Sequence, residues 1–122
     1  MARLDAIRMF LAPAGYKGFK VYQMDAKSAF LNGKLEEEVY IEWSEGFWLS
    51  AEKDYIFKLK KAIYGIKQAP RAWYAKLDKY LHQQGFQRGI KDKNIYMKLD
   101  YDNMIVIVSY VDDIIFGSNN DN

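Results

Sequence analysis

Two adjacent carboxylates, Asp112 and Asp113, interrupt an apolar, β-branched segment that runs from Met104 to Phe116. The apolar residues on both sides predict two short strands, and the Asp-Asp pair between them predicts the tight turn of a hairpin. Two ionised carboxylates side by side repel each other, so they need solvent or a bound cation. Since Mg²⁺ prefers oxygen ligands, the pair predicts half of a metal site.

A third carboxylate, Asp25, is expected at the end of another strand. Residues 19–24 read as that strand, and residues 27–33 read as a short helical turn ended by Asn-Gly. Carboxylates that converge from two strands suit phosphoryl transfer, in which two metal ions about 3.5–4 Å apart hold the attacking and leaving oxygens. On this hypothesis Asp25 and Asp112 bridge the two ions and Asp113 assists them.

The elements that must position these carboxylates follow from the apolar periodicity and from the Pro and Gly residues. One helix is expected over residues 2–11, ending at Pro13 and Gly15, and a second begins at Pro70 and ends at Gly85. Alternating residues predict further strands at 39–43, 55–60, 95–99 and 104–110, with the first two paired as a hairpin and a turn at 100–103. This order predicts an α+β fold with helices packed on one face of an antiparallel sheet.

Length and composition limit the remaining possibilities. A chain of 122 residues, half of them apolar, predicts a single domain, with an unstructured tail at residues 118–122. The absence of cysteine and the presence of one histidine exclude disulfides, thiolate chemistry and a zinc site of the usual type. Neither a secretory signal nor a membrane helix is expected, because the longest apolar run is far shorter than roughly 20 residues. An intracellular protein without a membrane partner is the expectation.

A basic cluster lies in the middle of the chain, interleaved with the aromatic residues Tyr64 and Trp73. The net charge of only +2 says little about partners, so a case for nucleic acid depends on this local clustering. Such a cluster can contact phosphates and stack on bases. A solvated charged face is the alternative, which composition alone favours. The five cations of the cluster are Lys58, Lys60, Lys61, Lys67 and Arg71.

Three blocks of sequence then carry a resemblance to a known family. They are residues 21–33 (VYQMDAKSAFLNG), 58–74 (KLKKAIYGIKQAPRAWY) and 110–113 (YVDD). In this order and spacing they resemble the reverse transcriptase of copia-type LTR retrotransposons, and residues 2–8 resemble the stretch before the first catalytic strand. The resemblance covers nearly the whole chain.

The resemblance implies a polymerase palm with part of the fingers, and RNA-directed DNA polymerisation with two Mg²⁺ ions, for which Mn²⁺ can substitute. Asp25 matches the family's first metal-binding aspartate, and Asp112 and Asp113 match the pair at the palm hairpin. Phe30 matches the aromatic residue whose bulk excludes the 2′-hydroxyl that distinguishes RNA from DNA building blocks. The resemblance also places four further residues at the nucleotide or primer terminus: Ala29, Gln68, Tyr110 and Val111.

The partners implied are an RNA or DNA template with its primer, dNTPs and the other domains of a polyprotein, namely thumb, ribonuclease H and integrase. The resemblance also implies a cytoplasmic particle, or the nucleus, as the location. Two departures from the family's pattern stand out: no proline follows Val39-Tyr40, and Ala26 replaces a valine. A second function remains open, namely a non-catalytic nucleic-acid-binding or assembly fragment in which the carboxylates persist by descent.

Overall fold

The computed structural model describes residues 4–42 and 56–120 of the chain. It divides into two compact units. The first comprises Met1–Ala29 and Leu77–Asn122, and the second comprises Phe30–Lys76. All three predicted catalytic aspartates belong to the first unit, whereas the predicted basic cluster belongs to the second.

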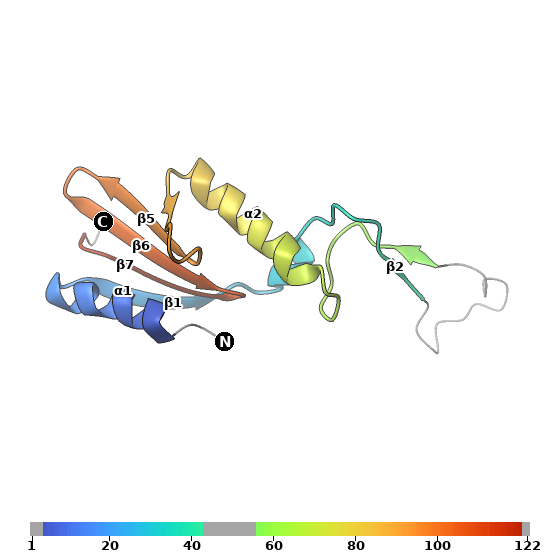
Figure 1. Cartoon of the computed structure of the whole chain (residues 1–122), viewed down its shortest axis with the longest axis horizontal. Helices are drawn as coiled ribbons and strands as arrows, with labels where there is room; N and C mark the ends of the chain where they lie inside the picture. Colours follow the sequence, from blue (N-terminus) through green and yellow to red (C-terminus); the bar gives the residue numbers. More distant parts are fainter. Residues whose placement is uncertain (1–3, 43–55, 121–122) are drawn as a thin grey trace. The chain divides into compact units, whose positions relative to one another are not determined.

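A five-stranded antiparallel sheet forms the centre of the first unit (Figure 1). Its strand order is β1-β7-β6-β5-β4, so β1 is an edge strand and β7 lies between β1 and β6. The hairpin predicted with its turn at 100–103 is confirmed. The hairpin predicted with its turn at Asp112-Asp113 also forms, but its turn residues are 111 and 112. Strand β4, which consists of two polar residues, was not predicted. The strand bounds are Lys20–Asp25 for β1, Gln87–Arg88 for β4, Ile95–Asp100 for β5, Asn103–Tyr110 for β6 and Asp113–Ser118 for β7.

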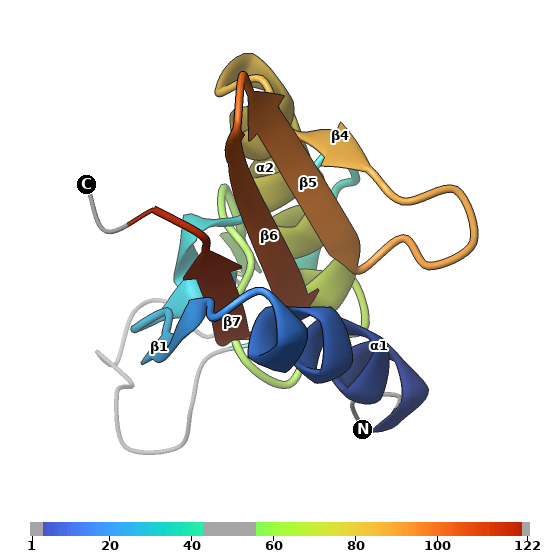
Figure 2. The same cartoon turned by 90° about the vertical axis from the view of Figure 1, so that its left-hand side faces the viewer.

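The predicted α+β class is confirmed, but the two helices do not share a face of the sheet. Phe10 of α1 (Leu4–Tyr16) lies against Gly117, on the face that also carries Val21. Asp78, in the C-terminal part of α2 (Ala69–Gln83), instead contacts Tyr96 on the other face. Figures 1 and 2 show α1 and this part of α2 on opposite sides of the sheet. Both faces carry apolar strand residues, so both need a cover.

We name these two faces after their helices. The cross-strand pairs Val21↔Gly117 and Val106↔Gly117 place these residues on the α1 face. The pairs Tyr22↔Phe116 and Ile107↔Phe116 define the α2 face in the same way. Since side chains alternate along a strand, these cross-strand pairs also fix the face on which each remaining residue of the paired strands lies.

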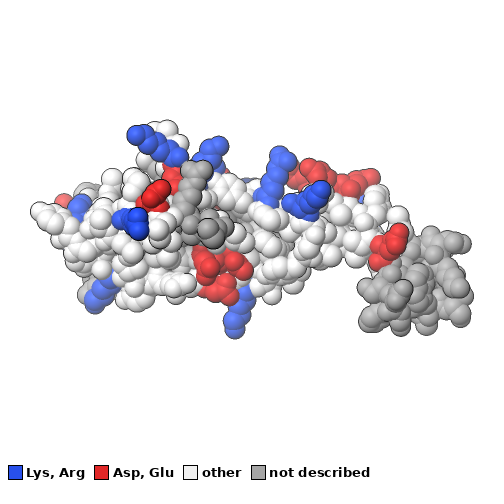
Figure 3. Space-filling view, turned by 60° about the horizontal axis from the view of Figure 1, so that its bottom comes forward, with Lys and Arg blue, Asp and Glu red and all other residues white. Residues whose placement is uncertain are grey.

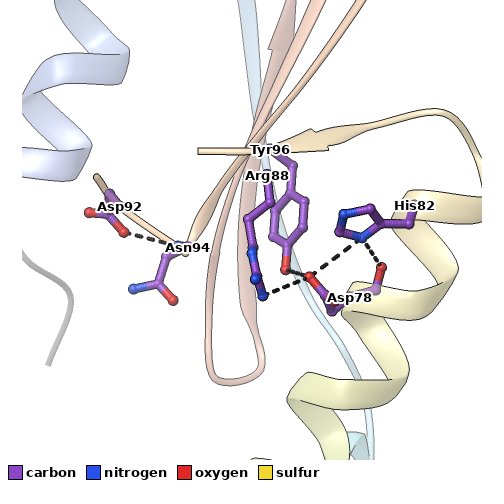
Figure 4. A network of polar contacts seen from close by, with 6 residues as sticks. All are labelled: Asp78, His82, Arg88, Asp92, Asn94 and Tyr96. Carbon is purple, nitrogen blue, oxygen red and sulfur yellow. Dashed lines mark hydrogen bonds and ion pairs between the residues drawn. The ribbon is translucent and has the colours of Figure 1, made fainter. Parts of the chain in front are cut away.

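The two faces have separate apolar cores. On the α1 face, α1 buries a stripe at four-residue spacing, which consists of Ala6, Phe10 and Ala14. On the α2 face, Leu77 and Leu81 of α2 are buried, and Tyr96 of β5 is fully buried. The Tyr96 hydroxyl donates to Asp78 Oδ1 at 2.8 Å, and Arg88 donates to the same oxygen at 3.2 Å (Figure 4). One carboxylate therefore ties α2 to both β4 and β5.

The predicted end of the first helix, at Pro13 and Gly15, is wrong by several residues. The helix continues to Tyr16, and Gly18 ends it in a left-handed conformation with φ of 67°. The Phe19 N–H donates to the Ala14 carbonyl and the Gly18 N–H to the Gly15 carbonyl, which is the Schellman pattern. Pro13 has no backbone N–H, but it lies near the C-terminal end of α1, so the hydrogen bond that it cannot make is lost close to where the helix ends. The predicted end of α2 at Gly85 is confirmed.

The second unit contains a two-stranded sheet and the N-terminal part of α2. Strands β2 (Tyr40–Ile41) and β3 (Phe57–Lys58) pair antiparallel, which confirms the predicted hairpin partners, although both strands are shorter than expected. Residues 43 and 55 of the predicted strands lie outside the described residues. Gly33 follows the 3₁₀ turn η1 (Ala29–Asn32), and a Cβ built on it would lie 2.9 Å from the Ala72 Cβ. Only glycine lets this loop approach α2 so closely.

The C-terminal segment is more ordered than predicted. Ser118 is the last residue of β7 and pairs with Lys20 and Ile105. The Asn119 side chain accepts a hydrogen bond from the Met104 N–H at 2.7 Å and donates to the Asp102 carbonyl at 2.6 Å. Residues 118–120, which were predicted as part of an unstructured tail, therefore make strand or hydrogen-bond contacts, and residues 121–122 lie outside the described part. None of the helices built from described residues has the length and apolar character that crossing a bilayer requires.

Candidate active site

The antiparallel register of β1 and β7 brings two of the three predicted carboxylates together. Asp25, the last residue of β1, lies directly opposite Asp113, the first residue of β7. The Ala26 N–H donates to the Asp112 carbonyl at 2.8 Å, so the 26–112 pair is the hydrogen-bonded rung of the ladder. The adjacent 25–113 rung is then a non-hydrogen-bonded pair, the kind in which facing side chains lie closest, with Cα atoms about 4.5 Å apart. Asp25 and Asp113 therefore share the α1 face of the sheet.

The hairpin turn lies one residue earlier than predicted. Tyr110 and Asp113 are paired, so Val111 and Asp112 are the central turn residues and Asp113 belongs to β7. Val111 has φ of 56°, a conformation that β-branched residues rarely adopt. A positive φ at the first central residue alone is the pattern of a type II′ turn, which suits the twist of a hairpin. The prediction missed this offset because glycine or asparagine normally occupies that position.

The donor atoms of this site suit a hard divalent cation. Asp25 and Asp113 are exposed and Asp112 is half-buried, so their oxygens are open to solvent or to a ligand. Within residues 4–42 and 56–120, however, no three His, Asp or Glu side chains form a group arranged to hold a metal ion. The register also places Asp113, rather than Asp112, opposite Asp25. Two facing carboxylates with a third next in the chain fit Mg²⁺ in donor chemistry.

The residues predicted to contact the nucleotide fall into both units. Tyr110 lies on the same rung as Asp113, and Val111 follows it in the turn, so both adjoin the carboxylates. Ala29 is fully buried in the first unit. Phe30 belongs to the second unit, where its ring packs 4.8 Å from the ring of Tyr64 at an angle of 46°. This aromatic contact restrains the Phe30 side chain.

Gln68 lines a pocket of about 200 Å³ in the second unit, together with two of the predicted basic residues, Lys67 and Arg71. Sequence reasoning missed three other charged residues at this pocket, Lys34, Glu36 and Glu37. The signal was present in the run Lys34 to Glu38, in which a lysine is followed by three glutamates. The pocket therefore combines charges of both signs.

Acidic neighbours balance part of the predicted basic cluster. Lys58 donates to Glu38, and Arg71 lies 4.0 Å from Glu37. Figure 3 likewise shows blue and red side chains close together rather than one continuous basic surface. Lys60, Lys61 and Lys67 are exposed and make no ion pair with any residue in the described part of the chain. A nucleic-acid strand would therefore meet a mixed surface.

Protonation of Glu38 is expected to release Lys58. The Lys58 ammonium, helped by the Tyr40 hydroxyl, lowers the pKa of the Glu38 carboxyl below its ordinary value of 4.5. Because the folded pKa is depressed, the stabilisation is fully present above pH 4.5 and is lost as the pH falls through the folded value. An NMR titration of the Lys58 side-chain signals should follow Glu38 and weaken with salt, since the pair is exposed. Glu38→Gln should abolish the titration and Glu36→Gln should not; the reverse result would contradict the pairing.

Comparison with known proteins decides the family. The family model described as reverse transcriptase (RNA-dependent DNA polymerase) matches residues 1–122, the full length of the chain. The chain belongs to this reverse transcriptase family. The resemblance to copia-type retrotransposon enzymes is thereby confirmed.

Several relatives of this reverse transcriptase domain are retrotransposon polyproteins. The chain is 40% identical over 116 residues to the retrovirus-related Pol polyprotein from transposon TNT 1-94 of Nicotiana tabacum, which is 94% of the chain and 9% of that protein. It is 40% identical over 114 residues to the Pol polyprotein from transposon RE2 of Arabidopsis thaliana, which is 93% of the chain and 8% of that protein. It therefore spans less than a tenth of the length of either. No solved structure matches it.

A more distant relative is much shorter. The chain is 35% identical over 95 residues to the putative transposon Ty5-1 protein of Saccharomyces cerevisiae, which is 78% of the chain and 31% of that protein. The similarity thus extends from plant to yeast retrotransposons.

The strained turn of the reverse transcriptase domain is expected to gain stability when Val111 becomes asparagine. Asparagine tolerates the left-handed region, whereas a bulky residue there costs about 1–3 kcal/mol. Val111 is 44% exposed, so little buried surface is lost. Urea denaturation should show a free energy of unfolding about 1 kcal/mol higher. Val21→Asn, at an exposed strand position with similar exposure, is the control and should lower it. A loss of stability for Val111→Asn would show that its side-chain contacts outweigh the backbone strain.

Proposed function

We propose that this reverse transcriptase domain supplies the metal-binding carboxylates for RNA-directed DNA synthesis, the template-directed transfer of nucleotides from dNTPs to a primer 3′-hydroxyl. The observation that carries the proposal is the register of β1 and β7, which sets Asp25 opposite Asp113 at one end of the sheet. Two facing carboxylates are costly without a partner, because like charges directly opposite destabilise a sheet. A site that retains this cost is a candidate for function.

The proposed ligands are Asp25, Asp112 and Asp113. When bound there, Mg²⁺ or Mn²⁺ supplies charge stabilisation for the attacking and leaving oxygens of phosphoryl transfer. The hydrogen bond from the Ala26 N–H to the Asp112 carbonyl fixes the turn against the end of β1. This bond holds the backbone of all three aspartates in one register. The chain therefore contributes negative charge at a preset place rather than a side chain that must move into it.

Phe30 is proposed to select deoxynucleotides by its bulk. Its ring is braced by Tyr64 at 4.8 Å, so it cannot easily turn aside for an additional hydroxyl. A rigid aromatic side chain excludes a 2′-hydroxyl by steric contact, and the 2′-hydroxyl is the group that differs between the two kinds of nucleotide. Tyr110 and Val111, which adjoin Asp113, are proposed to line the pocket near the primer terminus.

The template and primer are proposed to contact the cations of the second unit. Lys60, Lys61 and Lys67 are exposed and make no ion pair in the part of the chain that the structure describes. Lys58 and Arg71 would have to leave Glu38 and Glu37 to bind phosphate. This exchange lowers the net gain from each contact, so salt should weaken binding less steeply than for five free cations.

Paramagnetic Mn²⁺ tests the metal site in the 122-residue chain. We expect low Mn²⁺ concentrations to broaden the amide NMR signals of Asp25 and residues 110–113 before any others. The turn at 100–103 also carries two aspartates. It lies at the opposite end of β6 from the turn at 110–113, so it serves as an internal control. Equal broadening at both turns would show that Mn²⁺ is attracted to exposed carboxylates in general, and it would contradict the proposal.

The second candidate function is a nucleic-acid-binding or assembly fragment without catalysis. It is favoured by the lack of a ready three-residue metal group among the described residues. It predicts that an RNA–DNA duplex binds equally well with Mg²⁺ and with EDTA, whereas a working site predicts that dNTP binding needs the metal. Filter-binding measurements under both conditions separate the two.

A further inference from the structure

An apolar cavity of about 350 Å³ lies between α1 and the α1 face of the sheet, within the first unit. Its walls include Phe10 and Phe19 on one side and Met97, Met104 and Val106 on the other. Met9 also contributes and is 68% exposed, so it lies where the cavity opens to solvent. A volume of this size falls in the range of small-molecule sites, which are typically about 300–1,000 Å³.

The charge of the lining restricts what the cavity can hold. It carries no Lys, Arg or His and one carboxylate, Asp92. The Asp92 Oδ1 already accepts a hydrogen bond from the Asn94 N–H at 2.9 Å (Figure 4). An anion would be repelled by Asp92 and find no donor of positive charge. An apolar cavity of this kind is poor for water, which needs polar partners, and favours an uncharged ligand.

The loop that closes one side of the cavity is held by backbone hydrogen bonds. The Gly89 N–H donates to the Ile95 carbonyl at 2.7 Å, and the Ser109 N–H donates to the Asn94 carbonyl at 2.8 Å. A Cβ added at Gly89 would lie 2.6 Å from the Asp92 carbonyl oxygen, so this turn is closely packed. This loop is thus held in place without a ligand. The three methionines elsewhere in the lining have flexible side chains that can adapt to the shape of a ligand.

We infer that this cavity is a binding site for a small, uncharged, largely apolar molecule of one or two rings. The site is separate from the proposed carboxylate site. Its wall residue Val106 shares a rung with Gly117 and Val21, whereas Asp25 and Asp113 share a rung at the end of β1. Failure of either proposal therefore leaves the other intact.

Methyl NMR of the 122-residue chain provides a direct test, because the four methionines in the described part of the chain divide into two groups. Met9, Met97 and Met104 line the cavity, and Met24 lies on β1 with its side chain on the α2 face. With toluene as the probe, we expect saturable shifts of the three cavity methyl signals and none at Met24. Benzoate has the same ring but a negative charge, and it should shift none of them. Absence of saturation with toluene, or equal shifts at Met24, would overturn the inference.

Two variants locate the site. Val106→Phe places a ring in the cavity and should weaken toluene binding at least about tenfold, a loss of roughly 1.4 kcal/mol. Leu99→Phe adds a ring at a 71% exposed position on the same face and should leave binding unchanged. If Val106→Phe does not fold, the methyl shifts of the unaltered chain still decide the outcome. Loss of toluene binding in a longer polyprotein segment would show that another part of that chain fills the cavity, which would also overturn the inference.

Discussion

In a complete polymerase that contains this domain, Asp25→Asn and Asp113→Asn are each expected to lower metal-dependent nucleotide incorporation by about 100-fold or more. Loss of one carboxylate from a metal site removes several kcal/mol of transition-state stabilisation, and each 1.4 kcal/mol is a factor of ten. Thermal stability should stay the same or rise, because the register sets the two carboxylates opposite each other and the substitution removes their repulsion. Single-nucleotide primer extension and a melting curve on the same preparations measure the two effects.

The matched control is Asp100→Asn. Asp100 is an exposed carboxylate that ends β5 at the other turn of the sheet, opposite Asn103. Its replacement should leave incorporation unchanged. Full activity of Asp25→Asn would refute the proposed metal site. If the variant instead melts below the assay temperature, the loss of activity reflects unfolding.

The second large effect is expected at Asp78, which binds three partners on the α2 face. Its Oδ1 accepts from the fully buried Tyr96 hydroxyl and from Arg88, and His82 Nδ1 lies 3.5 Å from it. Asp78→Ala removes the hydrogen bonds from Tyr96 and Arg88 to this carboxylate, and a hydrogen bond to a charged group contributes about 1.5–3 kcal/mol. We expect the free energy of unfolding to fall by that amount in urea denaturation. Lys79→Ala, at the next and exposed helix position, should change it little.

A double-mutant cycle separates the hydrogen bond from general helix effects. Tyr96→Phe removes the hydroxyl and keeps the ring that packs in the core, so it should cost about 1 kcal/mol. In the Asp78→Ala background the same change should cost almost nothing, because the acceptor is already gone. Strictly additive losses would show that the 2.8 Å contact contributes no coupling energy.

Much of the fold was predictable because the signals are local. The alternating residues of β5 and β6 and the apolar stripe between Pro70 and Gly85 each express one periodicity, and the structure confirms them. Strand β4 was missed because Gln87 and Arg88 have no strand signature and pair only because β5 lies beside them. The side of the sheet that α1 covers depends on the long-range contact of Phe10 with Gly117, which no local pattern reports.

The candidate site shows the same division between local and long-range information. The type and position of Asp25, Asp112 and Asp113 were visible in the sequence, but the register that pairs Asp25 with Asp113 was not. The predicted turn had Asp112 and Asp113 at its centre, whereas the observed turn is shifted by one residue and has Val111 at its first central position. The partners of Lys58 and Arg71 were missed for a related reason, since Glu38 and Glu37 are distant in sequence from the cations they contact.

The position of β1 at the edge of the sheet has a consequence for how long the carboxylate pair persists. Among described strands, β1 is held by β7 alone, so the backbone groups of Val21, Gln23 and Asp25 that point away from β7 meet no ladder partner. Edge strands fray more readily than interior ones. When β1 opens, Asp25 departs while Asp113 stays with β6 and β7. The lifetime of the acidic pair is therefore set by how often β1 separates from β7. A partner that binds the open edge of β1 will also keep the pair assembled.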